Sequence, residues 1–167
     1  MLEDQLNKLL TEIQDHSLNT GGIFNAYIID KENSSVDCLS TLKKELLKVP
    51  RYANPASDGR YFESRDLEFL QLKEIQNWEE EIQNDIQHWV NFELINDSSK
   101  EQYNQEVIDL KQAELIAKIK SVKQPFKVFI SEGKFDVDFA PWADHINKDI
   151  YFDFEDQVLI VHFGWSS

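Results

Sequence analysis

The chain has 167 residues, of which 31 are acidic and 17 are basic, so its formal net charge at pH 7 is -14. This charge argues against nucleic acid or an anionic membrane surface as a direct partner, because binding to either relies on Lys and Arg. The aromatic content of 12% argues against a disordered acidic chain. We therefore expect one globular cytoplasmic domain over 1–167, without a signal peptide or membrane span and, with Cys38 alone, without an internal disulfide.

The first part of the chain, 1–62, is predicted to form a helix, a strand, a second helix and a loop. The first helix is indicated by apolar residues at steps of three and four, which are Leu2, Leu6, Leu9 and Ile13. A pair of glycines ends it, and 23–30 is rich in residues that favour strands. The second helix is expected near 36–48, and Pro50 ends it, because the residue before proline is pushed out of helical geometry. Its inner face would carry Leu39, Leu42 and Leu46.

Residues 63–123 predict a helical hairpin. The first helix would run from Ser64 to about Leu94, and the second would open at a capping box formed by Ser98 and Glu101. Helical spacing places one apolar stripe inward on each helix. The first stripe is Leu72, Ile75, Trp78, Ile82, Ile86 and Trp89, and the second is Tyr103, Val107, Leu110, Ala113 and Ala117. Two helices joined by so short a turn are expected to be antiparallel neighbours.

Residues 124–167 are predicted to form an antiparallel sheet, because the apolar period changes from 3.6 to 2 after Pro125. Four strands are expected, over 126–130, 135–139, 150–154 and 158–165. The last strand is apolar on both faces, so it should be central or covered. Together the segments indicate an α+β fold, in which a four-stranded C-terminal meander packs against an N-terminal helical portion with a long helical hairpin.

Two short blocks carry most of the negative charge. Residues 63–85 and 131–156 each contain 8 acidic and 2 basic residues, whereas the rest of the chain is nearly balanced. In the second block, strand alternation turns Asp136, Asp138 and Asp153 away from the core. Three such carboxylates could ligate a divalent cation, but outward polar residues are also expected on any half-exposed sheet. We expect no metal here and interpret this face as a negative surface that binds a basic partner.

The first block predicts a second acidic surface, made of Glu79, Glu80, Glu81 and Asp85. On a continuous helix the three consecutive glutamates would fan across the exposed side. Such residues are typical of the solvated face of an amphipathic helix, but the shortage of lysines at helical spacing also indicates an interaction surface. Trp142 and Asp144 lie in the loop after 135–139, where an exposed tryptophan beside a carboxylate would suit an interface anchor.

No catalytic set of residues is predicted, and no cofactor. The four histidines are not at metal-ligand spacing, and the sequence contains neither a nucleophile elbow nor a phosphate-binding glycine loop. His145, beside Asp144, is either half of an acid–base pair or a solvated loop residue. His162 is expected to be a core or edge histidine that holds a hydrogen bond, and Cys38 is expected to have a packing role.

These features favour an acidic binding protein without enzymatic activity. A bacterial immunity protein that neutralises a basic, nuclease-type toxin by occluding its active cleft has this profile, and a DNA-mimic inhibitor is a close variant. The alternative is a small metal-dependent hydrolase that uses Asp136, Asp138 and Asp153, with His145 as a further group. An adaptor role also stays open, in which the helical hairpin forms a homodimer through leftover apolar surface.

Overall fold

The computed structural model describes residues 1–18, 22–49, 68, 70–91, 103–123, 126–132 and 146–165. The helices are α1 (Leu2–Asp15), α2 (Cys38–Glu45), α4 (Trp78–Val90) and α5 (Gln105–Lys120), and a 3-10 turn covers Leu46–Lys48. The strands are β1 (Gly22–Asp30), β2 (Gln71–Ile75), β3 (Lys127–Glu132), β4 (Ile146–Asp153) and β5 (Gln157–Trp165). Among these elements, no helix has the length and apolar character that a membrane span requires.

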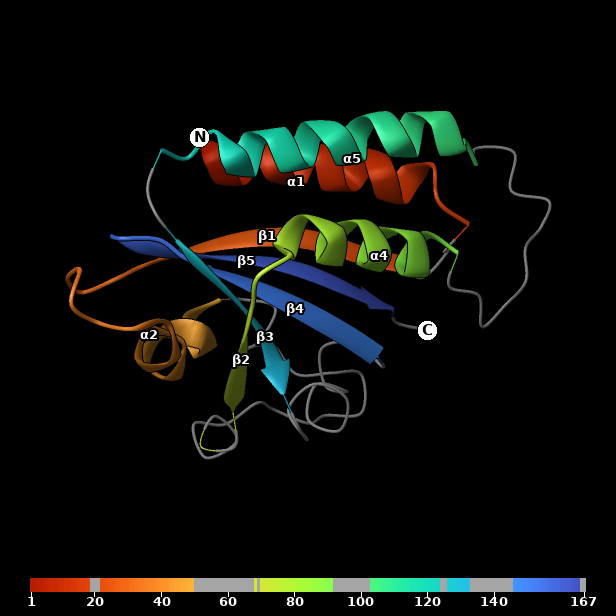
Figure 1. Ribbon diagram of the computed structural model, residues 1–167. Coiled ribbons are helices and arrows are strands. Elements are labelled where there is room, and N and C mark those ends of the chain that lie inside the picture. Colours follow the sequence, from red (N-terminus) through yellow and green to blue (C-terminus); the bar gives the residue numbers. More distant parts are fainter. Residues whose placement is uncertain are drawn as a thin grey trace.

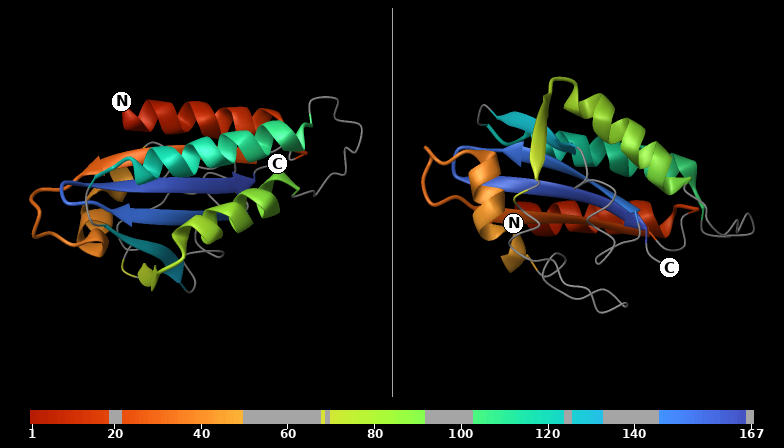
Figure 2. Two further views of the ribbon diagram at one scale, coloured as in Figure 1. Left: turned by 45° about the horizontal axis from the view of Figure 1, so that its top comes forward. Right: turned by 90° about the horizontal axis from the view of Figure 1, so that it is seen from below.

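The fold is α+β, as predicted. The strands form one antiparallel sheet in the order β1-β5-β4-β3-β2. Helices α1, α4 and α5 cover one face of this sheet, and α2 covers the other (Figures 1 and 2). The sheet is larger than the predicted four-stranded meander, because β1 and β2 join it as its two outer strands.

Strand β5 lies at the centre of both cores. It pairs with β1 and with β4 along almost its whole length. Its residues that face α1, α4 and α5 are Leu159, Val161 and Phe163, and those that face α2 are Val158 and Ile160. All residues from 158 to 164 are buried, which confirms the prediction that this strand is covered on both faces.

Helix α1 covers the outer strand β1 and bonds to its free edge. The side of α1 that packs on the sheet carries Leu6, Leu9, Leu10 and Ile13. Asn7 takes the place of a neighbouring strand, since its Nδ2 donates to the carbonyl of Ala26 at 2.9 Å and its Oδ1 accepts from the N–H of Ala26 at 2.7 Å. Glu3 and Gln14 accept from two further N–H groups of β1, at 2.7 and 3.1 Å. An edge strand bonded in this way is protected from pairing with another chain.

The predicted helix near 36–48 is confirmed as α2 and the 3-10 turn that follows it. The Asp37 carboxylate caps α2 by accepting from the N–H of Ser40 at 2.7 Å, and this hydrogen bond lowers the pKa of Asp37. On the inner face, Leu42 and Leu46 are fully buried and Leu39 is partly buried. Cys38 is buried as well, and desolvation raises the pKa of its thiol, so its predicted packing role is confirmed.

The prediction of one long helix from Ser64 to about Leu94 is wrong. Part of this segment is the strand β2, which pairs with β3, and α4 begins only at Trp78. Leu72 and Ile75 fit a helical stripe by their spacing alone, and hydrogen bonds to a neighbouring strand outweigh that local pattern. The predicted inward residues of α4 that are buried in the structure are Ile82, Ile86 and Trp89.

Helix α5 was predicted correctly in type and wrongly in orientation. The side chain of Asn104 caps it by accepting from the N–H of Val107 at 3.2 Å, while the predicted capping box at 98–101 lies outside the described residues. The buried residues of α5 are Ile108, Leu115, Ile116 and Ile119. The residues predicted to face inward that are instead exposed are Tyr103, Leu110, Ala113 and Ala117. Apolar residues occur on two sides of α5, so its period alone does not indicate which side contacts the sheet.

The predicted hairpin partners, α4 and α5, belong to a layer of three helices. Helix α5 lies between α1 and α4, as the left view of Figure 2 shows, and it packs against α1 as well as against α4. In the sheet, β3, β4 and β5 are consecutive antiparallel neighbours, as predicted. The predicted strand over 135–139 lies outside the described residues. Strand β4 begins at Ile146, inside a segment predicted to be a polar loop, because its polar residues pair in register with β5.

Candidate functional site

The structure describes five of the nine residues predicted to bind a partner. These five are Glu79, Glu80, Glu81, Asp85 and Asp153. The other four, Asp136, Asp138, Trp142 and Asp144, lie outside the described residues, as does His145. The predicted carboxylate face of the sheet is therefore represented by Asp153 alone, and the remaining candidates lie together on α4.

The three consecutive glutamates occupy the first turn of α4, which begins at Trp78. The N–H groups of a first turn have no partner within the helix, and the helix dipole places partial positive charge there. Carboxylates at this position stabilise the helix. The glutamate run therefore has a local structural cause, which was hidden from the sequence because the helix was predicted to start much earlier.

Lys148 on β4 joins the sheet to two of the α4 carboxylates. Its Nζ forms an ion pair with Asp85 Oδ1 at 3.0 Å and a second one with Glu81 Oε1. All three side chains are largely shielded from water, with 22% of Lys148, 29% of Glu81 and 10% of Asp85 exposed. Burial by itself would lower the pKa of Lys148, but the hydrogen bonds and charges of the two carboxylates outweigh it and raise this pKa. Two carboxylates of α4 therefore share the ammonium of Lys148.

Glu79 and Glu80 are placed closer to solvent than the Lys148 cluster. Glu79 pairs with Lys120 of α5 at 3.2 Å, and about half of each side chain is exposed. Exposed ion pairs of this kind contribute little to stability, because water and salt screen them. Glu80 is exposed next to this pair. At the start of α4, an incoming cation can therefore reach two carboxylates without breaking a buried interaction.

A surface depression opens beside these two carboxylates. It has a volume of about 430 Å³ and is lined by Gln76, Asn77, Trp78, Glu79, Glu80 and Gln83. The Trp78 ring is held from behind, since it meets Phe152 edge-on at 5.3 Å between ring centroids and Phe126 at 5.9 Å. Carboxylates around a depression bind a lysine or arginine side chain by ion pairing, and Trp78 is the aromatic residue among those that line this depression.

Asp153 lies in a different environment from the α4 residues. Its Oδ1 pairs with Lys31 Nζ at 2.5 Å, and only 17% of the Asp153 side chain and 4% of the Lys31 side chain are exposed. This pair connects the segment after β1 to the end of β4. The alternating strand pattern predicted that Asp153 lies on an outer face of the sheet. It did not reveal Lys31 as the partner, because this lysine is distant in the sequence.

A buried hydrogen-bonded network crosses β4 and β5 on the face of the sheet opposite α4. Asp149 and His162 are direct partners in the strand register, and His162 Nδ1 lies 2.5 Å from Asp149 Oδ1. The hydroxyl of Tyr151 donates to Asp149 Oδ2 at 3.2 Å, and all three residues are buried. The prediction of a hydrogen-bonded core histidine is confirmed. Its partners were missed, because only the register of β4 against β5 brings them together.

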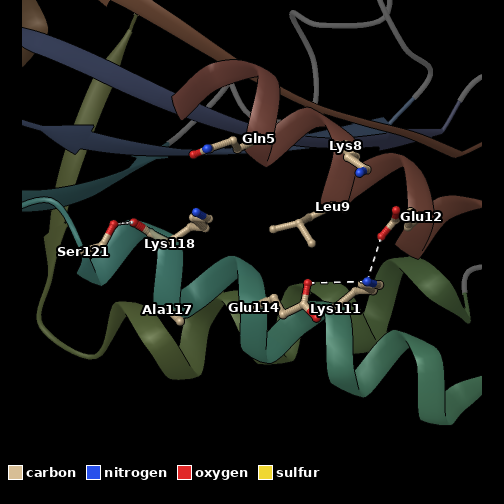
Figure 3. A pocket seen from close by; sticks show the side chains of 9 residues that line it. All are labelled: Gln5, Lys8, Leu9, Glu12, Lys111, Glu114, Ala117, Lys118 and Ser121. Carbon is tan, nitrogen blue, oxygen red and sulfur yellow. Dashed lines mark hydrogen bonds and ion pairs between the residues drawn. The ribbon is translucent and has the colours of Figure 1, made fainter. Parts of the chain in front are cut away.

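A groove between α1 and α5 is a second recess (Figure 3). It has a volume of about 530 Å³ and is lined by Gln5, Lys8, Leu9, Glu12, Lys111, Glu114, Ala117, Lys118 and Ser121. Lys111 bridges the two helices, pairing with Glu12 at 3.2 Å and with Glu114 at 3.4 Å. The hydrogen bond to Glu12, with the nearby charges, raises the pKa of Lys111. Leu9 and Ala117 form the apolar part of this groove, between charged side chains.

The described residues contain no group of three or more His, Cys, Asp or Glu side chains that could hold a metal ion. Comparison of the chain with protein-family models, with curated proteins and with solved structures finds no match. Function must therefore be argued from the chemistry of the surface itself.

Proposed function

We propose that this chain is a binding protein, which captures a basic protein partner at the depression in front of α4. The observation that carries the proposal is the placement of Glu79 and Glu80 beside the fixed ring of Trp78. The two carboxylates offer a lysine or arginine side chain an ion pair, and the proposal adds a cation–π contact from Trp78, which lines the same depression. The negative charge of the whole chain would speed the encounter with a basic surface.

The ion pair between Glu79 and Lys120 supports this proposal. Both side chains are about half exposed, so a cation from a partner can replace Lys120 at small cost. Lys148, by contrast, holds Glu81 and Asp85 in place and positions α4 on the sheet. Of the predicted α4 residues, Glu79 and Glu80 would then contact the partner, and Glu81 and Asp85 would position the helix.

The more specific form of the proposal is a cytoplasmic bacterial immunity protein, which occludes the active cleft of a basic, nuclease-type toxin. Its support is the acidic charge and the exposed carboxylates of α4, which suit a cleft built to bind phosphates. A DNA-mimic inhibitor would use the same chemistry. The alternative of a metal-dependent hydrolase has weaker support, since Asp153 is engaged by Lys31. Titrating a panel of basic nuclease domains with the chain, and measuring residual nuclease activity, would test the immunity role.

The general proposal can be tested with a labelled arginine-rich peptide, whose binding is followed by fluorescence anisotropy. The double variant Glu79→Gln/Glu80→Gln should weaken binding and reduce its dependence on salt. The matched control is Asp4→Asn/Asp15→Asn, which removes the same charge from exposed positions on α1. If both double variants lose the same affinity, binding depends on net charge alone and the α4 site is wrong.

A further inference from the structure

The two outer strands of the sheet, β1 and β2, differ in how their free edges are covered (Figure 1). On β1, side chains of α1 accept from the outward N–H groups of alternate residues, which are Phe24, Ala26 and Ile28. Within the described part of the chain, the residues of β2 have no hydrogen-bonding partner other than β3. One edge of the sheet is therefore closed by a helix, and the other is open.

The register of the sheet determines which backbone groups of β2 face outward. In an antiparallel sheet each residue directs its N–H and its C=O to the same side, and this side alternates along the strand. Ala26 of β1 faces outward, and carrying the alternation through β5, β4 and β3 gives Leu72 and Glu74 as the outward residues of β2. The turn after β4 fits this alternation, because the N–H of Phe154 donates to the carbonyl of Gln157 at 3.0 Å.

Strand β2 has few of the features that protect an edge strand. Proteins commonly block such an edge with a proline, a bulge or a covering element. The five residues of β2 include no proline, and their register with β3 is continuous. The exposed Lys73 is a charge of the protective kind, but it disfavours only a strand that places a positive residue directly opposite it. The open edge is thus selective without being closed.

A second copy of the chain is a poor occupant of this edge. If two β2 strands paired antiparallel through both outward residues of each, Leu72 of one copy would lie opposite Glu74 of the other. The residue between them, Lys73, would then lie opposite Lys73 of the second copy, where like charges repel. The net charge of -14 on each copy adds to this repulsion.

The chemistry around the edge fits a basic segment in extended conformation. The exposed side chain of Glu74 has no ion-pair partner among the described residues, so a lysine or arginine opposite it would form a cross-strand pair. The edge also continues into the proposed site, because Gln76 and Asn77, which directly follow β2, line the depression that contains Glu79. A chain that leaves the end of β2 would reach these carboxylates.

We propose that the basic partner docks through an extended segment, which pairs with β2 as an additional antiparallel strand. This inference rests on the proposed function, since it uses the same partner and the same depression in front of α4. Hydrogen bonds to Leu72 and Glu74 hold the backbone of the segment, and side chains supply the selectivity. Because the pairing is antiparallel, the amino-terminal end of the segment lies beside Gln76, and its basic residues there meet Glu79 and Glu80.

Hydrogen exchange, followed by NMR, tests the pairing with a labelled peptide of sequence Arg-Arg-Val-Arg-Thr-Val-Thr. The amides of Leu72 and Glu74 should exchange fast in the free chain and slowly with the peptide bound. The amides of Ala26 and Ile28 on the closed edge are the internal control, and should be slow in both states. The reversed peptide, which has the same charge, should bind more weakly because its arginines lie at the wrong end.

A proline variant tests the edge from the side of the protein. Glu74→Pro removes one outward N–H and leaves the bonds between β2 and β3 in place, since proline is tolerated where an edge N–H faces solvent. The matched control Glu74→Ala removes the same carboxylate and keeps this N–H. In fluorescence anisotropy, Glu74→Pro should bind the peptide about tenfold more weakly than Glu74→Ala. Far-UV circular dichroism checks that both variants are folded.

The outcomes separate this inference from the proposed function. A peptide that binds without slowing exchange at Leu72 and Glu74, or equal affinities of the proline and alanine variants, would overturn strand pairing and leave the α4 depression as the site. Equal binding of the reversed peptide would also overturn it, as would slow exchange that appears without peptide at high protein concentration, because a second copy would then cover the edge. If the edge amides become protected but Glu79→Gln/Glu80→Gln leaves the affinity unchanged, the α4 site is wrong and the edge pairing stands.

Discussion

Two neighbouring residues of β4, Lys148 and Asp149, point to opposite faces of the sheet. Lys148 belongs to a partly exposed group of charged side chains, and Asp149 belongs to a buried one. Lys148 meets Glu81 and Asp85 of α4, in a cluster that water reaches in part. Asp149 meets His162 of β5 in the interior, where both side chains are shielded from solvent. One network attaches a helix to the sheet, and the other joins two strands within it.

The comparison shows that the acidic residues of this chain have separate roles. A carboxylate in the interior must have partners, since a buried charge without them is costly. A carboxylate at the surface needs none and remains available to another molecule. The net charge of the chain therefore overestimates the number of carboxylates that a partner can reach. Among the described residues of the predicted site, Glu79 and Glu80 are accessible to a partner.

The largest effect is expected in the buried network. Asp149→Ala removes the acceptor of both His162 and Tyr151, and should lower the free energy of unfolding by about 3–5 kcal/mol. Urea unfolding followed by tryptophan fluorescence measures this change. The control Asp156→Ala, at an exposed turn, should stay within about 0.5 kcal/mol of the parent chain. A loss at Asp149 as small as that of the control would show that the buried network adds no stability.

An intermediate effect is expected in the half-buried cluster. Lys148→Met leaves Glu81 and Asp85 without their shared cation and should cost about 1–3 kcal/mol. Because the pKa of Lys148 is raised in the folded state, its contribution is complete below the ordinary lysine pKa and is lost as pH rises through the folded-state pKa. The difference in unfolding free energy between parent and variant should therefore shrink at alkaline pH. A difference that stays constant there would contradict the charge-based explanation.

The smallest effect on stability is expected at the exposed pair. Lys120→Met should change the free energy of unfolding by less than about 1 kcal/mol, and added salt should remove the difference. The same variant should bind the arginine-rich peptide more tightly, because it frees Glu79. Unchanged or weaker peptide binding would show that Lys120 does not compete with the partner at this site.

Several elements were readable from local patterns. The leucine period of α1 and the unbroken apolar run of β5 predicted a helix and a covered strand, and both predictions are confirmed. Each of these two patterns is long, and only one regular secondary structure would bury all of its apolar residues. The segment that contains β2 is the opposite case. Leu72 and Ile75 of β2 follow helical spacing by coincidence, and their strand conformation depends on β3, which comes much later in the chain.

In the candidate site, too, some features were predictable from the sequence and others depended on tertiary contacts. Charge counting found Glu79, Glu80, Glu81 and Asp85, because an excess of carboxylates is visible without coordinates. It did not find which of them are already paired, since the lysines come from α5 and β4. Asp149 and Tyr151 were not singled out as members of a site, although Asp149 lies in the second acidic block and Tyr151 in a predicted strand. Their partnership with His162 arises from strand register, which no local period encodes.

Composition and periodicity were sufficient to establish the fold class, the identity of most helices and strands, and the acidic character of the surface. Each of these depends on residues close together in the chain. The exposure of Leu110 on α5, the pairing of Lys148 with α4 and the burial of Asp149 against His162 were decided by tertiary contacts. A period shows that a helix has an apolar side, but only the arrangement of the whole chain determines what that side, or a given charge, will meet.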